Sequence, residues 1–157
     1  FIASIDVDDP VFSSMGDMPC KIEQHCQASG QSIPSSKNET IRTALEGLAL
    51  KYRQVLENLR SQTGKSLEQI HIVGGGTKNE LLNQMTADST GCEIIAGPIE
   101  ATSVGNILVQ MIATGEISSL TEGRQLVRES FEPKRYQPHH SEQCEEAYQT
   151  MRSLNQV

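Results

Sequence analysis

The sequence lacks both an excess of basic residues and any long apolar run. Its 13 Lys and Arg stand against 20 Asp and Glu, which gives a formal net charge of -7 at pH 7. Nucleic acids and anionic membranes bind basic surfaces, so this charge argues against both. No apolar stretch approaches the roughly 20 residues of a membrane span, and no N-terminal secretion pattern is present. We therefore expect neither a nucleic acid nor a membrane as partner.

The cysteines lack the spacing of a structural site. They are scattered without a Cys-x-x-Cys pair, at Cys20, Cys26, Cys92 and Cys144. This pattern argues against a disulfide framework or a zinc site and predicts reduced thiols in a cytoplasmic protein. His139 and His140 together with Cys144 are a further metal candidate. Because they follow Pro138 in a polar stretch, we expect a solvated tail there instead.

Length and composition indicate one globular domain. The chain has 157 residues, 36% hydrophobic and 21% charged, which suffices for a single core. It opens at Phe1, without a methionine, in an apolar and acidic segment. We expect it to be a piece of a larger protein.

Three consecutive glycines, Gly74, Gly75 and Gly76, follow an apolar run and precede a helical pattern. A turn without side chains lets the backbone approach another molecule closely. The start of a helix adds unpaired N–H groups and a positive dipole end, which favour a phosphate or a nucleotide. The triplet is therefore either a nucleotide loop or only a tight strand-to-helix turn.

Two common glycine motifs do not fit this triplet. A Walker-type loop ends in Gly-Lys-Ser/Thr, whereas Lys78 lies here between Thr77 and Asn79. A dinucleotide fingerprint needs Gly-x-Gly-x-x-Gly or Ala, and Asn79 occupies its third glycine position. Both interpretations of the turn stay open, and Lys78 is expected to be a solvated side chain.

Hydrophobic periodicity predicts alternating helices and strands, and hence an α/β fold. Ser36 and Glu39 form a capping box before the longest helix. Residues 1–18 and 131–138 are expected to be irregular. The expected helices span about residues 19–30, 37–62, 78–90, 102–114 and 120–128. A weak helix is expected after Glu146, up to Leu154, and the expected strands are 69–73 and 93–96.

The same spacing predicts which faces are buried. The polar helix 19–30 is expected on the surface and the strand 69–73 in the core. Thr102 or Ser103 is expected to cap the helix 102–114. The expected apolar faces are Leu81, Leu82 and Met85 in one helix, and Val104, Ile107, Leu108, Met111 and Ile112 in the other.

Two strands are too few to bury several amphipathic helices, since stable sheets commonly have about four to six strands. Further strands are therefore expected either within residues 1–18 or from a partner chain. Exposed helix stripes could also drive self-association of the chain.

The order of several short segments is specific to one family. Around the triplet these segments are Ile70–Val73, Asn79, Leu81–Gln84 and Ala87–Asp88. In this order they resemble the FGGY family of carbohydrate kinases. Further segments narrow the resemblance to members that phosphorylate L-rhamnulose: Ala96–Thr102, Gly105–Asn106, Gly16–Pro19 and Leu48–Arg53. The resemblance covers about residues 5–138.

The resemblance implies an actin-like, ribonuclease-H-like ATPase fold, of which this chain would hold an incomplete sheet flanked by helices. Such members transfer the γ-phosphoryl group of ATP, with Mg²⁺, to the 1-hydroxyl of L-rhamnulose. Residues 1–138 would be the ATP-binding side of the C-terminal kinase domain, and residues 139–157 a polar tail. The catalytic base, the sugar contacts and most of the metal site would belong to an N-terminal part, so the isolated chain is expected to be inactive.

The resemblance also implies site residues. Gly74, Gly75 and Gly76 match the adenosine loop of the family, and Gly75 matches the glycine assigned to ATP contact, where a Cβ would occupy ligand space. Asn79 matches an asparagine near the adenine and ribose, and its amide can both donate and accept. Thr77 is expected to cap the following helix. No catalytic residue and no metal ligand is expected in this chain.

Some neighbouring features are expected to be structural. Asp88 and Glu100 should cap or support turns, because a single carboxylate is weak evidence for a metal. Some family members carry paired cysteines, but the partner position of Cys26 is Thr43 here, so no disulfide is transferred. Two rival hypotheses remain: a non-catalytic actin-like nucleotide-binding or assembly module, and an FGGY kinase for another sugar.

Overall fold

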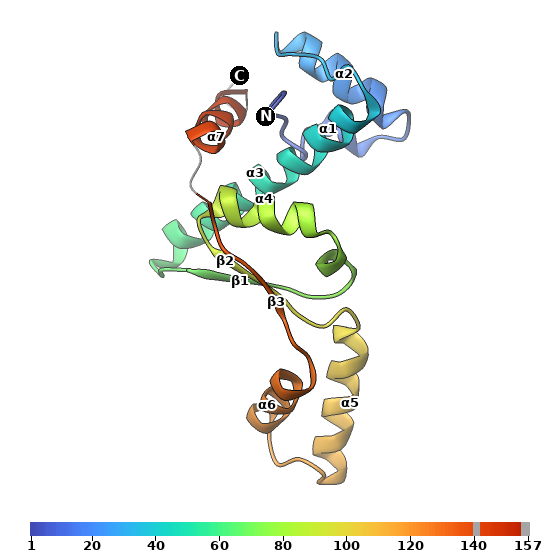
Figure 1. Cartoon of the computed structure of the whole chain (residues 1–157), viewed down its shortest axis with the longest axis vertical. Helices are drawn as coiled ribbons and strands as arrows, with labels where there is room; N and C mark the ends of the chain where they lie inside the picture. Colours follow the sequence, from blue (N-terminus) through green and yellow to red (C-terminus); the bar gives the residue numbers. More distant parts are fainter. Residues whose placement is uncertain (140–141, 155–157) are drawn as a thin grey trace.

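The computed structural model describes residues 1–139 and 142–154 (Figure 1). Helices predominate, and the strands form one small sheet. In chain order the elements are α1 (Pro10–Ser13), α2 (Met18–Ala28), α3 (Lys37–Thr63), β1 (Gln69–Ile72), the 3-10 turn η1 (Gly75–Lys78), α4 (Glu80–Thr90), β2 (Glu93–Ala96), α5 (Ala101–Thr114), α6 (Leu120–Ser130), β3 (Lys134–Tyr136) and α7 (Glu142–Leu154).

The sheet has the strand order β1-β2-β3. β1 runs parallel to β2, with Gln69 opposite Glu93, and β3 runs antiparallel to β2, with Ile94 opposite Tyr136. The prediction of irregular chain over 131–138 is therefore wrong at β3. Prolines flank this short strand and two of its three residues are charged, so only its pairing with β2 identifies it. Residues 1–18 contain no strand.

α4 covers one face of the sheet through a buried cluster of Ala87, Ile94, Ala96 and Tyr136. Its expected apolar face is wrong, since Leu81 is 50% exposed. The helix buries small polar residues instead, namely Asn83, Thr86, Ser89 and Thr90. They can be buried because their polar groups have partners. The Thr86 and Thr90 hydroxyls donate to carbonyls within α4, and the Asn83 amide donates to the Thr77 carbonyl. The Ser89 hydroxyl donates to a carbonyl of α3, at Ala49, over 2.8 Å, which brings the two helices close together.

α3 begins as predicted, because the Ser36 hydroxyl accepts the Glu39 N–H. The Glu39 carboxylate, however, accepts from the N–H and hydroxyl of Ser35, and both bonds lower its pKa. Near the middle of the helix, Gly47 allows the chain at Ile5 to pass very closely. A Cβ built at Gly47 would lie 2.7 Å from the Ile5 side chain.

The lead-in and α2 form a second core beside α3. Ala3, Ile5, Ile22 and Cys26 are buried together. The expectation that the helix 19–30 lies only on the surface is therefore wrong, because the extended residues before α1 cover one side of it. Burial raises the pKa of the Cys26 thiol.

α7 packs on α3 through a third cluster of Leu50, Ala147, Tyr148 and Met151 (Figure 1). Arg53 of α3 lies 4.0 Å above the Tyr148 ring and pairs with Glu145 over 2.6 Å. Burial, followed by the hydrogen bond to Glu57, raises the pKa of Tyr148 to about 12. The expectation of a solvated tail is wrong for Cys144, which is buried on α7, while His140 lies outside the described residues.

α5 and α6 form a hairpin that projects away from the sheet (Figure 1). Of the predicted stripe on α5 only Leu108 is buried, so that expectation is wrong, and Ile107 is 56% exposed. The predicted cap is also wrong: α5 begins at Ala101, with Glu100 as an N-cap whose side chain makes no capping bond. Across the described helices, none is long and apolar enough to cross a membrane.

Candidate functional site

The glycine triplet forms a turn at the carboxyl end of β1. Gly74 adopts φ 81° and ψ -160°, a conformation that residues with a Cβ rarely reach. The chain then makes the single turn η1, and the Thr77 N–H and hydroxyl both donate to the Gly74 carbonyl. α4 starts only at Glu80, two residues later than expected. The chain therefore passes from β1 through a sharp turn at Gly74 into a short 3-10 turn.

Two backbone hydrogen bonds join this turn to the loop after β2. The Gly74 N–H donates to the Pro98 carbonyl over 3.0 Å, and the Gly97 N–H donates to the Ile72 carbonyl over 2.8 Å. β1 and β2 are parallel, so their carboxyl ends meet at one edge of the sheet. In open α/β sheets this edge is where ligands bind. The structure thus brings together two segments that are far apart in the sequence.

Asn79, and not Thr77, caps α4. The Asn79 side-chain oxygen accepts the Leu82 N–H over 3.1 Å, whereas the Thr77 hydroxyl closes the preceding turn. The cap predicted at Thr77 is therefore wrong. Among the described residues no hydrogen bond engages Asn79 Nδ2, so this exposed amide keeps a donor for a ligand.

Asn83 is a positioning residue that the sequence reasoning missed. It is 1% exposed, and its Nδ2 donates to the Thr77 carbonyl over 3.1 Å. This bond fastens the exposed turn to the buried face of α4. The sequence does show an amide side chain one helical turn after the Asn79 cap. It does not show that this amide donates to the Thr77 carbonyl, which only the structure reveals.

The three glycines differ in whether the fold requires a residue without a side chain. Gly74 needs its positive φ, and a Cβ on Gly76 would lie 3.7 Å from Ile72, an ordinary contact. A Cβ on Gly75 would meet no atom within 4 Å. Neither backbone strain nor crowding within the chain therefore explains a glycine at position 75. Gly75 is exposed at the start of the 3-10 turn.

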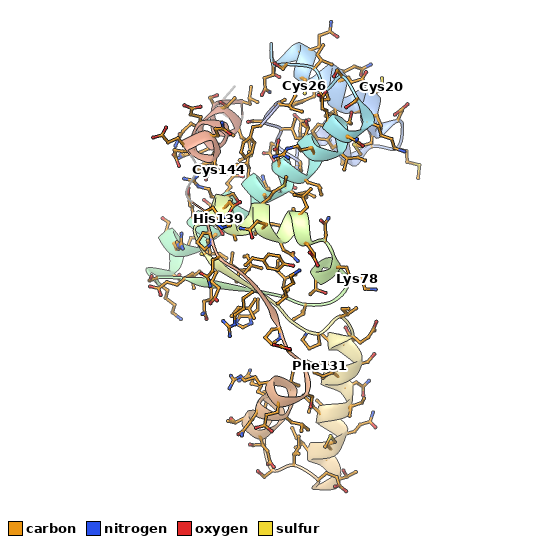
Figure 2. All side chains as sticks on the ribbon, viewed as in Figure 1. Cys20, Cys26, Lys78, Phe131, His139 and Cys144 are labelled. Carbon is orange, nitrogen blue, oxygen red and sulfur yellow. The ribbon has the colours of Figure 1, made fainter. Side chains whose placement is uncertain are left out.

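Charges flank the turn without forming a metal site. Lys78 is exposed beside it (Figure 2), and Lys134 pairs with Glu80 over 2.7 Å. Glu80 raises the Lys134 pKa. Asp88, at the other end of α4, accepts from Gln84 and from the His139 N–H, each over 2.8 Å, and so supports a turn as expected. In residues 1–139 and 142–154 no group of three His, Cys, Asp or Glu could hold a metal ion, so no metal-dependent step is assigned to these residues.

Comparison with known proteins decides the family. The profile of the FGGY family of carbohydrate kinases, C-terminal domain, matches residues 7–114, which include the triplet and the loop after β2. The chain belongs to the FGGY family of carbohydrate kinases. This confirms the resemblance seen in the sequence.

Several rhamnulokinases are similar to the chain. The chain is 40% identical over 148 residues to the rhamnulokinase of Bacteroides thetaiotaomicron, covering 94% of this chain and 30% of that protein. It is 41% identical over 134 residues to the rhamnulokinase of Bacillus subtilis, covering 85% of this chain and 28% of that protein. The chain thus spans less than a third of the length of these relatives.

Solved structures of FGGY kinases share the fold. Plasmodium falciparum glycerol kinase with ADP matches with a TM-score of 0.63 at 20% identity, covering 75% of this chain and 24% of that chain. Xylulose kinase from Rhodospirillum rubrum matches with a TM-score of 0.60 at 18% identity, covering 78% and 25%. The chain therefore has part of the actin-like ATPase fold, with a small three-stranded mixed sheet.

Proposed function

We propose that this chain is the ATP-binding C-terminal portion of a cytoplasmic sugar kinase. The complete enzyme would transfer the γ-phosphoryl group of ATP to O1 of L-rhamnulose, yielding ADP and L-rhamnulose 1-phosphate in L-rhamnose catabolism. The observation that carries the nucleotide role is Gly75, a glycine that the fold does not require, at the ligand-binding edge of the sheet. The sugar rests on the identity of about 40% to rhamnulokinases.

In this proposal each residue of the turn has a separate role. Gly74 gives the turn its shape, and Gly75 and Gly76 leave room for ribose or phosphate beside the backbone. Asn79 Nδ2 donates to the nucleotide while Asn79 Oδ1 stays engaged with α4. A kinase of this family typically uses a divalent metal with ATP. We assign Mg²⁺, held mainly by residues outside this chain, as are the catalytic base and the sugar contacts.

The domain assignment is proposed on the same basis. Residues 1–138 form the C-terminal kinase segment, since the family profile covers residues 7–114 and β3 completes the described sheet. Residues 139–157 are assigned to a separate, largely polar C-terminal segment, of which α7 packs on α3.

Titration of the chain with ADP tests the nucleotide role. We expect saturable binding by calorimetry, with slower amide hydrogen exchange over residues 74–79 and 97–100 when ADP is bound. These two segments should respond together because backbone hydrogen bonds join them. Exchange over α7 is the internal control and should stay unchanged. A well-folded chain that shows no saturable binding would contradict a nucleotide site and favour the assembly-module hypothesis.

The isolated chain is expected to show no kinase turnover. Phosphoryl transfer requires the nucleotide, the acceptor hydroxyl and the charge-stabilising groups to be positioned together. In a coupled ADP-release assay with ATP, Mg²⁺ and L-rhamnulose, we expect the rate to equal that of a blank without protein. Turnover that persists through purification and disappears when L-rhamnulose is omitted would show that the chain holds a complete active site.

A further inference from the structure

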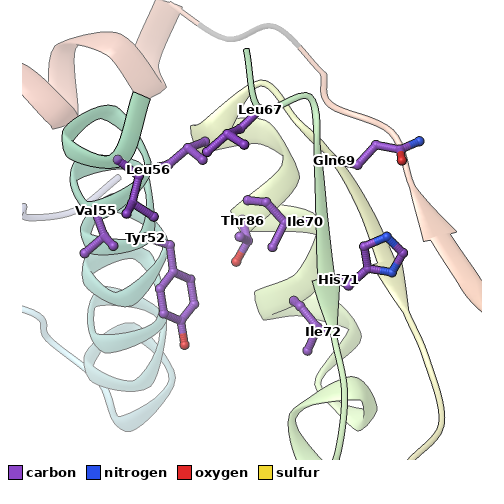
Figure 3. Close-up of a pocket in the computed structure, with 10 residues that line it drawn as sticks. Tyr52, Val55, Leu56, Leu67, Gln69, Ile70, His71, Ile72 and Thr86 are labelled. Carbon is purple, nitrogen blue, oxygen red and sulfur yellow. The ribbon is translucent and has the colours of Figure 1, made fainter. Parts of the chain in front are cut away.

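A small cavity of about 150 Å³ lies where α3, α4 and α7 meet the first residue of the chain. We call it the Glu46 cavity, and the residues that line it are Phe1, Arg42, Glu46, Met85, Asp88, Gln143 and Cys144. Charged side chains line this cavity, whereas no described Asp, Glu, Lys or Arg lines the groove beside the open edge of β1 (Figure 3). Among the described residues, none of the glycine turn lines the Glu46 cavity.

Glu46 brings a buried carboxylate with one oxygen that lacks a partner. The residue is 1% exposed. Its Oε1 accepts the Arg42 Nε–H over 2.8 Å, and the Phe1 ammonium lies 3.9 Å from the same oxygen, beyond hydrogen-bond distance. Oε2 is also buried, and no hydrogen-bond donor of the described residues reaches it. A buried charged oxygen is costly unless it is paired, so Oε2 calls for a positively charged partner.

Asp88 places a second carboxylate on the same cavity. Its side chain is 24% exposed, and the hydrogen bonds that it accepts from Gln84 and from the His139 N–H both reach Oδ1. Its other oxygen, Oδ2, therefore stays available to a ligand. The buried Cys144 thiol (Figure 2) senses both carboxylates: burial raises its pKa most, and the charges of Asp88 and Glu46 raise it further. The two negative charges therefore act on one place in the cavity.

The charge and size of the cavity suit a small cation that keeps part of its water. Arg42 offsets one of the two carboxylate charges, which leaves Glu46 Oε2 and Asp88 Oδ2 to share a single positive charge. The amide oxygen of Gln143, which is exposed, is a further neutral ligand at a place that solvent ions can reach. One water needs only about 10–15 Å³ of such space, so the cavity has room for an ion with several waters.

The same ligands do not suit a tightly held divalent metal. Ca²⁺ takes about 6–8 oxygen ligands, most of them from the protein. In the part of the chain that the structure describes, no group of three His, Cys, Asp or Glu could hold a metal ion. Two carboxylate oxygens with an amide and water match a more weakly bound ion of single charge.

We propose that the Glu46 cavity binds one hydrated monovalent cation of the size of K⁺ between Glu46 Oε2 and the Asp88 carboxylate. The ion joins α3 to α4 and, through Gln143, to α7. It gives the buried carboxylate the partner that the described residues do not supply. This site goes beyond the proposed nucleotide role and does not depend on it.

Thermal unfolding in KCl tests the site. At constant chloride, KCl replaces tetramethylammonium chloride, whose ion has the same charge but methyl groups in place of a surface that oxygen ligands can approach. The thermal midpoint is expected to rise saturably, by about 3–6 °C once K⁺ reaches ten times its dissociation constant, because the ion binds only the folded chain. Neither ATP nor sugar is present, so a failed ADP titration would leave this result untouched.

A matched pair of variants assigns the response to the cavity. Glu46→Gln keeps the size of the side chain but removes the charge, so it should abolish the rise in KCl. Without K⁺ it should be at least as stable as the parent, because no buried charge is left unpaired. Glu116→Gln makes the same change at an exposed residue outside the cavity and should keep the full response.

A second variant and a heavy-ion probe keep the test decisive should Glu46→Gln fail to fold. Asp88→Asn retains an acceptor for Gln84 and His139 but loses the charge, and it should weaken K⁺ binding about tenfold. Crystals of the parent chain grown in RbCl should show an anomalous peak beside Glu46 Oε2 and Asp88.

Three outcomes would overturn the proposal. One is a parent chain whose thermal midpoint is the same in KCl and in tetramethylammonium chloride, which would leave the cavity to water alone. Another is a K⁺ response that Glu46→Gln or Asp88→Asn retains in full. The third is a rubidium peak that lies elsewhere, with none beside Glu46.

Discussion

Met151→Asp is expected to release α7 from α3 while the rest of the chain stays folded. Met151 is 0% exposed and packs in the cluster with Leu50 and Tyr148. Removing a buried Met costs about 2–5 kcal/mol, and burying an unpaired carboxylate adds to that cost. The remaining Arg53–Glu145 ion pair has an exposed partner and contributes at most about 1 kcal/mol, so it cannot hold the helix in place.

Limited proteolysis and amide exchange over residues 142–154 measure this release. In Met151→Asp, cleavage and exchange within α7 should become fast, while β2 keeps the protection of the parent chain. Thr150→Asp introduces the same charge one residue earlier at an exposed position, and it should behave like the parent. If Met151→Asp is as well protected as Thr150→Asp, the buried cluster contributes little to holding α7 on α3. If α7 is unprotected already in the parent chain, the expectation of a solvated tail holds.

Element boundaries were predictable where short-range chemistry determines them. α3 was predicted at residues 37–62 and spans Lys37–Thr63, because the cap at Ser36 and the stop at Gly64 act on their own helix. β3 was missed because its evidence is not local. Lys134 and Arg135 carry charge, and their backbone is a strand only through pairing with β2, about 40 residues earlier in the sequence.

Which face of a helix is buried was predicted less well. Periodicity shows that an apolar stripe exists, but the neighbouring elements decide whether it is covered. On α5 only Leu108 of the stripe is buried, Ile107 is exposed and the other three residues are half-buried. Within the described residues α6 is the main element that packs on this helix. On α4 the close approach of α3 selects small polar residues such as Thr86, since their hydroxyls can donate within the helix itself.

The candidate site shows the same division between local and long-range information. The glycine turn and its place after a strand could be predicted from the sequence, because the triplet follows the β-branched Ile70 and Ile72 of β1 and Gly74 indeed adopts a positive φ. The bond from Gly74 to Pro98 could not, since it depends on the parallel pairing of β1 with β2. The predicted cap of α4 was also wrong. Thr77 and Asn79 can both cap a helix, but the 3-10 turn places only Asn79 at the start of α4.

Gly75→Val and Gly74→Val are expected to separate ligand contact from backbone strain. Gly75→Val should lower the ADP affinity about a hundredfold or more, because its branched side chain occupies the proposed ribose or phosphate space, a loss of about 2.7 kcal/mol. Its thermal midpoint should stay close to the parent value, since a Cβ at this position meets no atom within 4 Å. Calorimetric titration and differential scanning calorimetry give the two quantities.

Gly74→Val should lower the thermal midpoint as well as the affinity. A side chain at φ 81° and ψ -160° costs about 1–3 kcal/mol, which corresponds to a fall of roughly 2–12 °C for a domain of this size. Gly75→Ala supplies a graded control, with a smaller loss of affinity than Gly75→Val.

If Gly75→Val binds ADP like the parent, a side chain fits at position 75 in the complex, and Gly75 does not make the proposed contact. If it unfolds the chain, position 75 is structural and its effect on ADP says nothing about the ligand. Gly75 is assigned to the nucleotide contact only if Gly75→Val loses ADP affinity while its thermal midpoint stays at the parent value.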